Sequence, residues 1–401
     1  MYHKKSLSLH RFMKELSTRL TIFASMIQKI LLLATLAIVL LSGCESNKQA
    51  DFVFTTPHSR LMTRLDTLRL HGIMYGHVDD PFCGHSWQME KDSSDTHAVA
   101  GDYPAVVGFD LSGIELGNAC NQDSIPFSAI REEIIKHHKR GGIIVLSWHP
   151  RNPLSDGPAT DVSQPSAVQS ILKGGKKNAK FVGGLHKLVA FLKTLQTKDG
   201  RSIPYIFRPW DHYNSNDYWW GVGQCSDEEF IQLWNLVQDY MRDRLYTKPI
   251  WCFTTDLQGE WNNELFQHRY PGNDRVDMLG CDAYQCDTTR HFAAQLDSCL
   301  SWMHVLSRQN NKMMTITECG TQHDPSGQWW SQVLLPVLSR YPLCFAMAGK
   351  NTSAVAFGAA QETPATNDFI DLFQKHLLLL LDDVAPKMGD IGRDSSELLW
   401  L

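Results

Sequence analysis

Polar and aromatic side chains follow short apolar runs in the sequence, at the positions where strands would end. These residues are His77, Asp79, Asp80, Asp110, Trp148, His149, Arg208, Trp210, Asp211, His212, Asp256, Asp282, Tyr284 and Glu318. Carboxylic acids and imidazoles are the usual general acids and bases. Because a purely structural strand can end in any turn residue, the pattern indicates a catalytic or binding site.

Tryptophans occur close to the same positions. They are Trp87, Trp148, Trp210, Trp219, Trp220 and Trp251. An indole face suits the apolar C–H face of a sugar, and carboxylates and imidazoles suit its hydroxyls, so the combination favours a carbohydrate over a phosphorylated metabolite. We assign Trp251, inside an apolar run, to the core. Trp219 and Trp220 follow a polar loop, and we expect them in the cleft.

Eight short apolar or β-branched runs alternate with amphipathic stretches. The runs cover residues 72–77, 105–110, 142–149, 203–210, 249–256, 276–284, 313–318 and 343–348, and the helical patterns cover 128–139, 185–197, 227–244, 290–308, 329–339 and 368–380. This alternation predicts an α/β fold with a parallel sheet, and the count of eight favours a single (β/α)8 TIM barrel, in which strand ends converge on one cavity. A doubly wound open sheet is the alternative, but no GxGxxG or GxxxxGK[ST] loop follows any run.

Several collinear segments resemble glycoside hydrolase family 26, the β-mannanases, over about residues 66–373. They are MYGHVDD (74–80), GDYPAVVGFDLSGIE (101–115), SWHPRNP (147–153), FRPW (207–210), YWWG (218–221), RYPGNDRVDMLGCDAYQ (269–285) and TECG (317–320). The resemblance implies a (β/α)8 barrel and retaining cleavage of β-1,4-mannosidic bonds in mannan, glucomannan or galactomannan. It implies no metal and no organic cofactor.

The resemblance also implies roles for particular residues. Retaining glycosidases use two carboxyl groups about 5–5.5 Å apart, one as nucleophile and one as acid and then base. The family nucleophile matches Glu318, and the tyrosine that hydrogen-bonds it matches Tyr284. The histidine that contacts sugar matches His149, and Arg208 matches an arginine that we expect to brace the carboxylates. We assign substrate binding to His149, Trp148, Arg208, Trp219, Trp220, Asp282 and Tyr284.

The acid/base position departs from the family pattern. The family reads RPWHE and then WFWWG, whereas residues 208–221 read RPWDHYNSNDYWWG. His212 therefore stands in place of the acid/base glutamate, and Asp211 in place of the preceding histidine. An imidazole can donate and accept a proton near neutral pH, so we expect His212 to act here, oriented by Asp211 and with its pKa raised by Glu318. A second departure follows strand eight, where residues 349–351 read GKN instead of WRN.

Two other readings of the sequence stay open. One is a mannan-binding surface protein whose hydrolase site is degenerate, and the other is a barrel enzyme that acts on a different β-glycan because of its altered loop at residues 349–350. Release of reducing ends from mannan, compared with affinity for the same polymer, separates an enzyme from a binding protein.

Composition and the N-terminal residues indicate where the chain works. The 401 residues are 43% hydrophobic and 20% charged, as in a soluble globular protein, and a net charge of −5 argues against nucleic acid as a partner.

Residues 30–41 are typical of a signal-peptide core, and the following LSGC resembles a bacterial lipobox that ends in Cys44. We expect an extension and signal at 1–43, a lipidated Cys44 and tether at 44–57, a glycoside hydrolase domain at 58–385 and a tail at 386–401.

This reading predicts a lipid-anchored protein of the bacterial cell envelope, on the periplasmic or cell-surface face. The mature chain should begin at Cys44, because signal cleavage at a lipobox precedes the cysteine. N-terminal sequencing of protein isolated from the envelope checks this, and an intact Met1 would contradict it.

Overall fold

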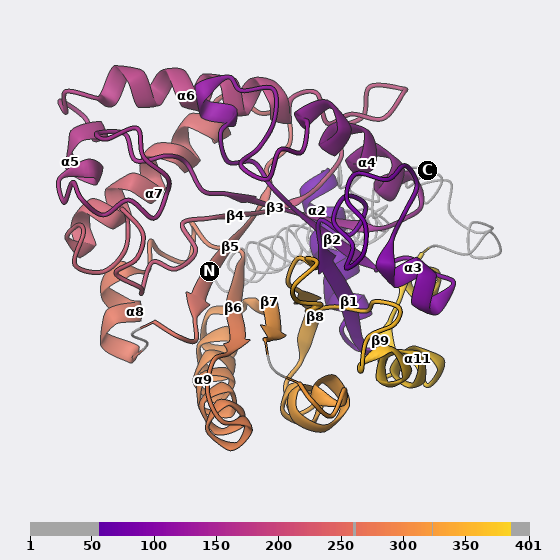
Figure 1. Cartoon of the computed structure of the whole chain (residues 1–401). Coiled ribbons are helices and arrows are strands. Elements are labelled where there is room, and N and C mark those ends of the chain that lie inside the picture. The colour runs from indigo at the N-terminus through magenta and orange to yellow at the C-terminus, as the bar shows by residue number, and fades with distance from the viewer. Residues whose placement is uncertain (1–55, 260–261, 323, 386–401) are drawn as a thin grey trace, which may run out of the picture. The chain divides into compact units, whose positions relative to one another are not determined.

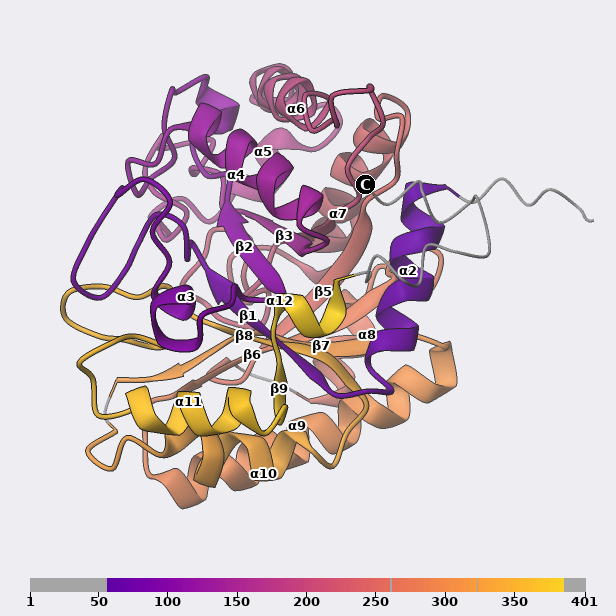
Figure 2. The same cartoon turned by 90° about the vertical axis from the view of Figure 1, so that its right-hand side faces the viewer.

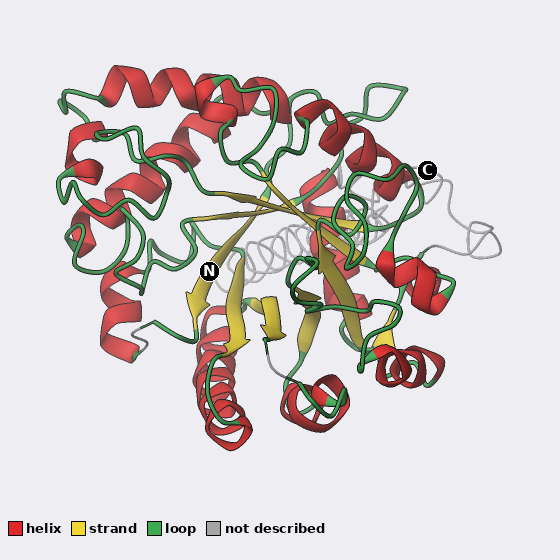
Figure 3. Ribbon diagram, viewed as in Figure 1, coloured by secondary structure: helices red, strands yellow, loops and turns green. Residues whose placement is uncertain are grey.

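The computed structural model describes residues 56–259, 262–322 and 324–385, and it shows strands surrounded by helices (Figures 1 and 3). The strands are β1 (Ile73–Val78), β2 (Val106–Asp110), β3 (Ile143–Trp148), β4 (Ile206–Pro209), β5 (Ile250–Asp256), β6 (Met278–Gln285), β7 (Met313–Thr321), β8 (Leu343–Ala348) and the short β9 (Leu378–Leu379). The helices are α2 (Pro57–Leu68), α3 (Asp95–Ala100), η1 (Ile114–Leu116), α4 (Phe127–Lys139), α5 (Ala167–Ile171), α6 (Asn178–Leu192), α7 (Asp227–Arg242), α8 (Asn263–Arg269), α9 (Thr289–Asn310), η2 (Trp330–Leu334), α10 (Leu335–Leu338), α11 (Thr366–Gln374) and α12 (Leu381–Val384).

The sheet closes on itself. Strands β2 to β8 pair in chain order, and β1 pairs in parallel with both β8 and β2. Gly76 in β1, for example, lies opposite Val106 on one side and Met347 on the other. The predicted (β/α)8 barrel is therefore confirmed, and each of the eight apolar runs forms one of its strands.

Large apolar side chains fill the barrel interior at close packing. Met347 projects from β8 so near to β1 that a Cβ at Gly76 would lie 2.9 Å from its side chain, and a Cβ at Gly108 would meet its sulfur at the same distance. The two glycines therefore make room for the methionine.

The two ends of the barrel differ. Leu61 and Leu65 of α2 are buried in one cluster with interior residues such as Met74 and Ile206, so α2 closes the end where the strands begin. Figure 2 shows α2 at one end and α3, with long connecting loops, at the other. The site must therefore lie at the loop-bearing end, where the strands finish.

Two helical predictions need correction. The pattern at 368–380 predicted one helix, but α11 ends at Gln374, His376 has a left-handed φ of 51°, and Leu378–Leu379 forms β9 beside β1. The pattern at 329–339 predicted an α-helix, but it begins as the π-helix η2. Pro336 lacks the N–H that would close a regular turn there, which explains the irregular start.

Cys44, the predicted signal and the tail at 386–401 lie outside the described residues. Among the helices that are described, none is both long enough and apolar enough to cross a membrane.

Candidate active site

Arg208, near the end of β4, is 1% exposed and joins three carboxylates. Its Nη1 lies 2.8 Å from Asp211 Oδ2 and 3.0 Å from Asp282 Oδ2, and its Nη2 donates to Glu318 Oε1. A buried guanidinium requires such partners because an unpaired charge is costly away from water. The ends of β4, β6 and β7 are therefore fixed around one cation, and these are carboxylates of the kind that we expected Arg208 to brace.

Glu318 is the one of these three carboxylates that reaches solvent. Its side chain is 22% exposed, and Oε2 accepts a hydrogen bond of 2.8 Å from the Tyr284 hydroxyl. Asp282, opposite Glu318 in the sheet, lies beneath and accepts a 2.8 Å bond from Thr317 Oγ1. Burial raises the pKa of Asp282 to about 7, against the opposing charge of Arg208.

The chain turns sharply after β4. Trp210 and His212 have left-handed φ angles of 58° and 55°, so Asp211 and His212 do not alternate as strand residues would. Asp211 points to the buried Arg208, whereas His212 is 23% exposed. The strained turn thus directs the two neighbouring side chains to different surroundings.

Asp211 and His149 form a buried pair. His149 Nε2 lies 2.9 Å from Asp211 Oδ2, and its Nδ1 lies 2.8 Å from Asp110 Oδ1. Burial lowers the pKa of His149, but Asp211 and Asp110 outweigh it and hold that pKa well above its ordinary value. Both nitrogens are therefore engaged as donors to carboxylates, and the side chain of His149 stays 14% exposed. Its predicted contact with sugar stays a prediction.

His212 is oriented by Asp256 and not by Asp211 as predicted. Its Nδ1 lies 2.9 Å from Asp256 Oδ2 at the end of β5, and its ring is stacked on Tyr218 at 4.7 Å between centroids and 4° between planes. Burial lowers the pKa of His212, but the Asp256 hydrogen bond and the charges of Asp211 and Asp282 together raise it to about 9. The sequence predicted that Glu318 would raise this pKa, but Asp256, Asp211 and Asp282 are the carboxylates that raise it.

A second buried arginine holds the loop that carries His212. Arg269 donates to the backbone oxygens of Tyr213, Trp220 and Cys225 at 3.1, 3.2 and 2.8 Å. Its Nε also donates to Asp227, at the start of α7, at 2.7 Å. The loop after β4 is thus anchored to two helices, which gives His212 a rigid support.

The tryptophans expected in the cleft belong to the core, and this corrects the prediction. Trp219 and Trp220 are 1% and 0% exposed, and each packs edge-on against Trp210. Their indole N–H groups donate to the backbone oxygens of Pro150 and Asp211 at 2.9 and 2.8 Å. Trp148 is fully buried beside Trp210 as well. None of them offers a face to a ligand.

The loop after β8 fits closely against Tyr284. A Cβ at Gly349 would lie 2.3 Å from the Tyr284 hydroxyl, the same hydroxyl that bonds Glu318. The next residue, Lys350, places its Nζ 2.5 Å from Asp123 Oδ1, which links the loops after β8 and β2. A larger residue at 349 would therefore displace a contact of the nucleophile candidate.

A cavity of about 470 Å³ opens between the loops after β1, β2 and β8. Its lining includes Trp87, Asp123 and Lys350. Trp87 is half-buried, and its Nε1 donates to Asp95 at 2.7 Å, while Asn351 donates to the same carboxylate at 2.8 Å. The cavity thus offers a fixed indole and polar groups beside the strand ends.

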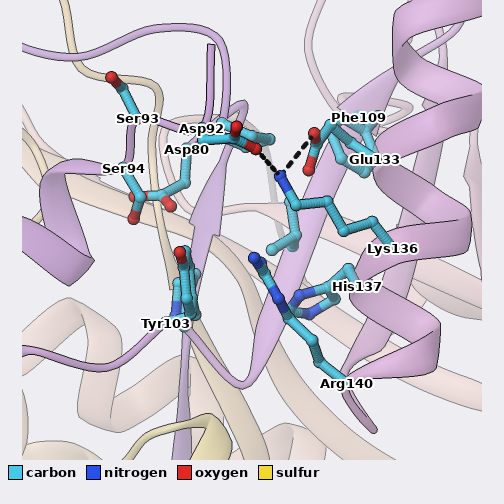
Figure 4. Close-up of a pocket in the computed structure, with 13 residues that line it drawn as sticks. Asp80, Asp92, Ser93, Ser94, Tyr103, Phe109, Glu133, Lys136, His137 and Arg140 are labelled. Atoms are coloured by element: carbon cyan, nitrogen blue, oxygen red, sulfur yellow. Dashed lines mark hydrogen bonds and ion pairs between the residues drawn. The ribbon is translucent and has the colours of Figure 1, made fainter.

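A smaller gap lies farther out, between β2 and α4 (Figure 4). Its volume of about 20 Å³ is enough for roughly one water molecule. Lys136 reaches into it and pairs with Asp92 at 2.6 Å and Glu133 at 3.1 Å (Figure 4). We interpret it as a packing defect closed by ion pairs and not as a ligand site.

Asp211, His212 and Asp282 are the one group of three metal-type ligands found in the described part of the chain, with donor atoms within 4.8 Å of one another. Arg208 already pairs with both carboxylates at 2.8 and 3.0 Å. A bound cation would face this guanidinium at close range, so we interpret the group as part of an ion-pair network.

Several site residues were not assigned from the sequence. The sequence identifies Asp110 and Asp256 only as strand ends, although each holds a histidine of the site. Tyr218 was noted only within YWWG, although it supports His212. The strand-end position was the available signal for the two aspartates, but their partners come from other strands.

Comparison with known proteins agrees with this geometry. A β-mannanase of family 26 from Bacteroides ovatus superposes with a TM-score of 0.79 at 32% sequence identity, over 83% of this chain and 98% of that one. A mannan endo-1,4-β-mannosidase of Bifidobacterium adolescentis is 30% identical over 241 residues, 57% of this chain and 24% of that protein. One of Bacillus subtilis is 26% identical over 234 residues, 56% of this chain and 61% of that protein.

This chain therefore spans about a quarter of the Bifidobacterium relative and three fifths of the Bacillus one. The sequence profile of glycosyl hydrolase family 26 matches residues 54–318, which is well over half of the chain. The chain belongs to glycosyl hydrolase family 26.

Proposed function

We propose that this protein is a retaining glycoside hydrolase that cleaves β-1,4-linked mannan, glucomannan or galactomannan. The observation that carries the proposal is Glu318, partly exposed at the end of β7 and held by Arg208 and Tyr284. Mannan as the polymer is supported by the relatives, which bear the names β-mannanase and mannan endo-1,4-β-mannosidase.

In the proposed first step, Glu318 attacks the anomeric carbon and His212 protonates the leaving oxygen. The two oxygens of Glu318 are fixed by Arg208 and Tyr284, which pre-orients the nucleophile. With a pKa of about 9, the imidazole of His212 carries a proton at neutral pH. Its nearness to the nucleophile is supported by Asp282, which approaches His212 within 4.8 Å and shares Arg208 with Glu318.

We also retain the lipid anchor at Cys44 and the envelope location as proposals. They are supported by the apolar run at residues 30–41 and the LSGC that follows it. N-terminal sequencing of protein isolated from the envelope tests them.

The nucleophile can be tested by covalent trapping. A 2-deoxy-2-fluoro-mannosyl probe with a good leaving group should label Glu318, because the fluorine slows breakdown of the glycosyl-enzyme. Peptide mapping by mass spectrometry locates the label. Glu318→Gln should lose both labelling and mannan cleavage, whereas Asp123→Asn should still be labelled at Glu318. A label on another residue, with Glu318→Gln still active, would reject the assignment.

Trp87 replaces Trp219 and Trp220 as the expected stacking residue. Trp87→Ala should cost on the order of 1–3 kcal/mol in affinity for mannooligosaccharides, because an indole face covers much of a sugar ring. Calorimetric titration measures this. The buried Trp219→Phe is the matched control and should lower the melting temperature with little change in affinity. Equal affinities for wild type and Trp87→Ala would exclude stacking at Trp87.

Asp256 should set the pH range of the proton donor. Its carboxylate helps to raise the pKa of His212 to about 9, so activity that needs the imidazolium is present below that pH and is lost as the pH rises through it. Asp256→Asn keeps an acceptor for Nδ1 but removes the charge, and it should move the basic limb of the kcat/KM profile down by about 1–2 pH units. Asp123→Asn, which removes a charge that does not contact His212, should leave the limb in place. A limb that stays unmoved in Asp256→Asn would refute the role of His212.

A further inference from the structure

We propose that inorganic phosphate competes with water for the glycosyl-enzyme, so that this site can release a β-configured glycosyl phosphate. The inference rests on the proposed function, because it requires a glycosyl ester on Glu318. It concerns the second step of the reaction, in which an acceptor molecule approaches the anomeric carbon beside the acid/base residue.

The geometry fixes which nitrogen of His212 meets that acceptor. Nδ1 is held by Asp256 at 2.9 Å, and the parallel ring of Tyr218 lies 4.7 Å away. The backbone of Asp256 is in turn fixed by reciprocal bonds with the Asn214 side chain, at 2.8 and 2.9 Å. Because a flip of the ring would break the hydrogen bond between Nδ1 and Asp256, Nε2 is the atom left for the acceptor.

The surroundings of His212 favour its charged form. It is approached by Asp256 from β5, by Asp211 from the turn after β4 and by Asp282 from β6, while Arg208 opposes them. The carboxylates prevail, so His212, which gives its proton to the leaving group in the first step, is reprotonated by solvent before the second step at neutral pH. An imidazolium cannot take a proton from water, whereas the carboxylate that the family resemblance places at this position can.

Phosphate does not need that proton transfer. At neutral pH it is already an oxyanion, and the exposed group that it meets is a cation with an N–H donor. Glu318 carries no charge while it is esterified, and Asp211 and Asp282 are 0% and 1% exposed and paired with Arg208. Asp256 lies on the far nitrogen of His212. Esterification of Glu318, the pairing of Asp211 and Asp282 with Arg208, and the placement of Asp256 on the other nitrogen therefore all weaken the repulsion that phosphate meets at the acceptor position.

The step balances without a redox partner. A phosphate oxygen of HPO₄²⁻ forms a bond to the anomeric carbon, and the bond from that carbon to Glu318 breaks with its electron pair returning to the carboxylate. Two inversions retain the β configuration. The phosphate keeps its own proton, and His212 keeps its proton as a hydrogen-bond donor. His212 regains the proton spent in the first step from solvent.

Reactivation of the trapped enzyme tests the proposal. Protein labelled with the 2-deoxy-2-fluoro-mannosyl probe is freed of excess reagent and incubated in buffer alone, with inorganic phosphate, or with sulfate at equal ionic strength. We expect phosphate to speed loss of the label at least tenfold over sulfate, with 2-deoxy-2-fluoro-mannosyl phosphate detected by mass spectrometry and phosphorus NMR. Mannotriose incubated with phosphate should likewise give a glycosyl phosphate.

Two variants make the test specific. In His212→Glu the acceptor meets a carboxylate, and in Asp256→Asn the imidazole more readily becomes neutral and can activate water. Either variant, once its labelling shows an active fold, should show a much smaller ratio of phosphate to sulfate rates. Equal rates in phosphate and sulfate for the wild type, with only the free sugar released, would overturn this inference and leave the proposed function intact. Failure to label Glu318 would overturn both.

Discussion

The site depends on the guanidinium of Arg208. Three carboxylates from three strand ends converge on it. Without this cation Asp211, Asp282 and Glu318 would repel one another, and the first two are shielded from water. The two terminal nitrogens of the planar guanidinium have different partners. Nη1 pairs with the two buried aspartates, and Nη2 donates to the partly exposed Glu318. A lysine has no such pair of nitrogens and offers only a point charge, so it would not reproduce the spacing of the three acids.

Chain order and apolar pattern were enough to predict the barrel, because each strand is buried on both faces and leaves a continuous apolar run. The same reasoning failed at residues 378–379, where the pairing of β9 with β1 outweighs a helical pattern.

Reasoning from sequence also failed for Trp219 and Trp220. A tryptophan after a polar loop can line a cleft or anchor the loop to the core. The two cases are distinguished only by the backbone oxygens of Pro150 and Asp211, which accept the indole N–H groups of Trp219 and Trp220. Asp256 was a visible strand end, but its partner His212 belongs to a different strand.

The departures from the family pattern are accommodated by particular neighbours. Gly349 fits closely against Tyr284, and Lys350 is paired with Asp123 across the cleft. Asp211 stands where the family pattern has a histidine, and it is balanced by Arg208 and His149. Each altered residue is thus hydrogen-bonded, ion-paired or tightly packed, which is the condition for keeping polar groups in a buried site.

In the proposed mechanism, His212 and Asp256 act as one unit. A glutamate acid/base alternates between a neutral and a negative state, whereas a histidine alternates between a positive and a neutral one, so every state of the site is more positive by one charge. Asp256, 2.9 Å from Nδ1, offsets this difference. If a carboxylate replaced the imidazole, it would have no N–H to donate to Asp256 and would bring a second negative charge close to it. The protonation of residue 212 consequently depends on Asp256 at the end of β5 as much as on the turn after β4 that carries residue 212.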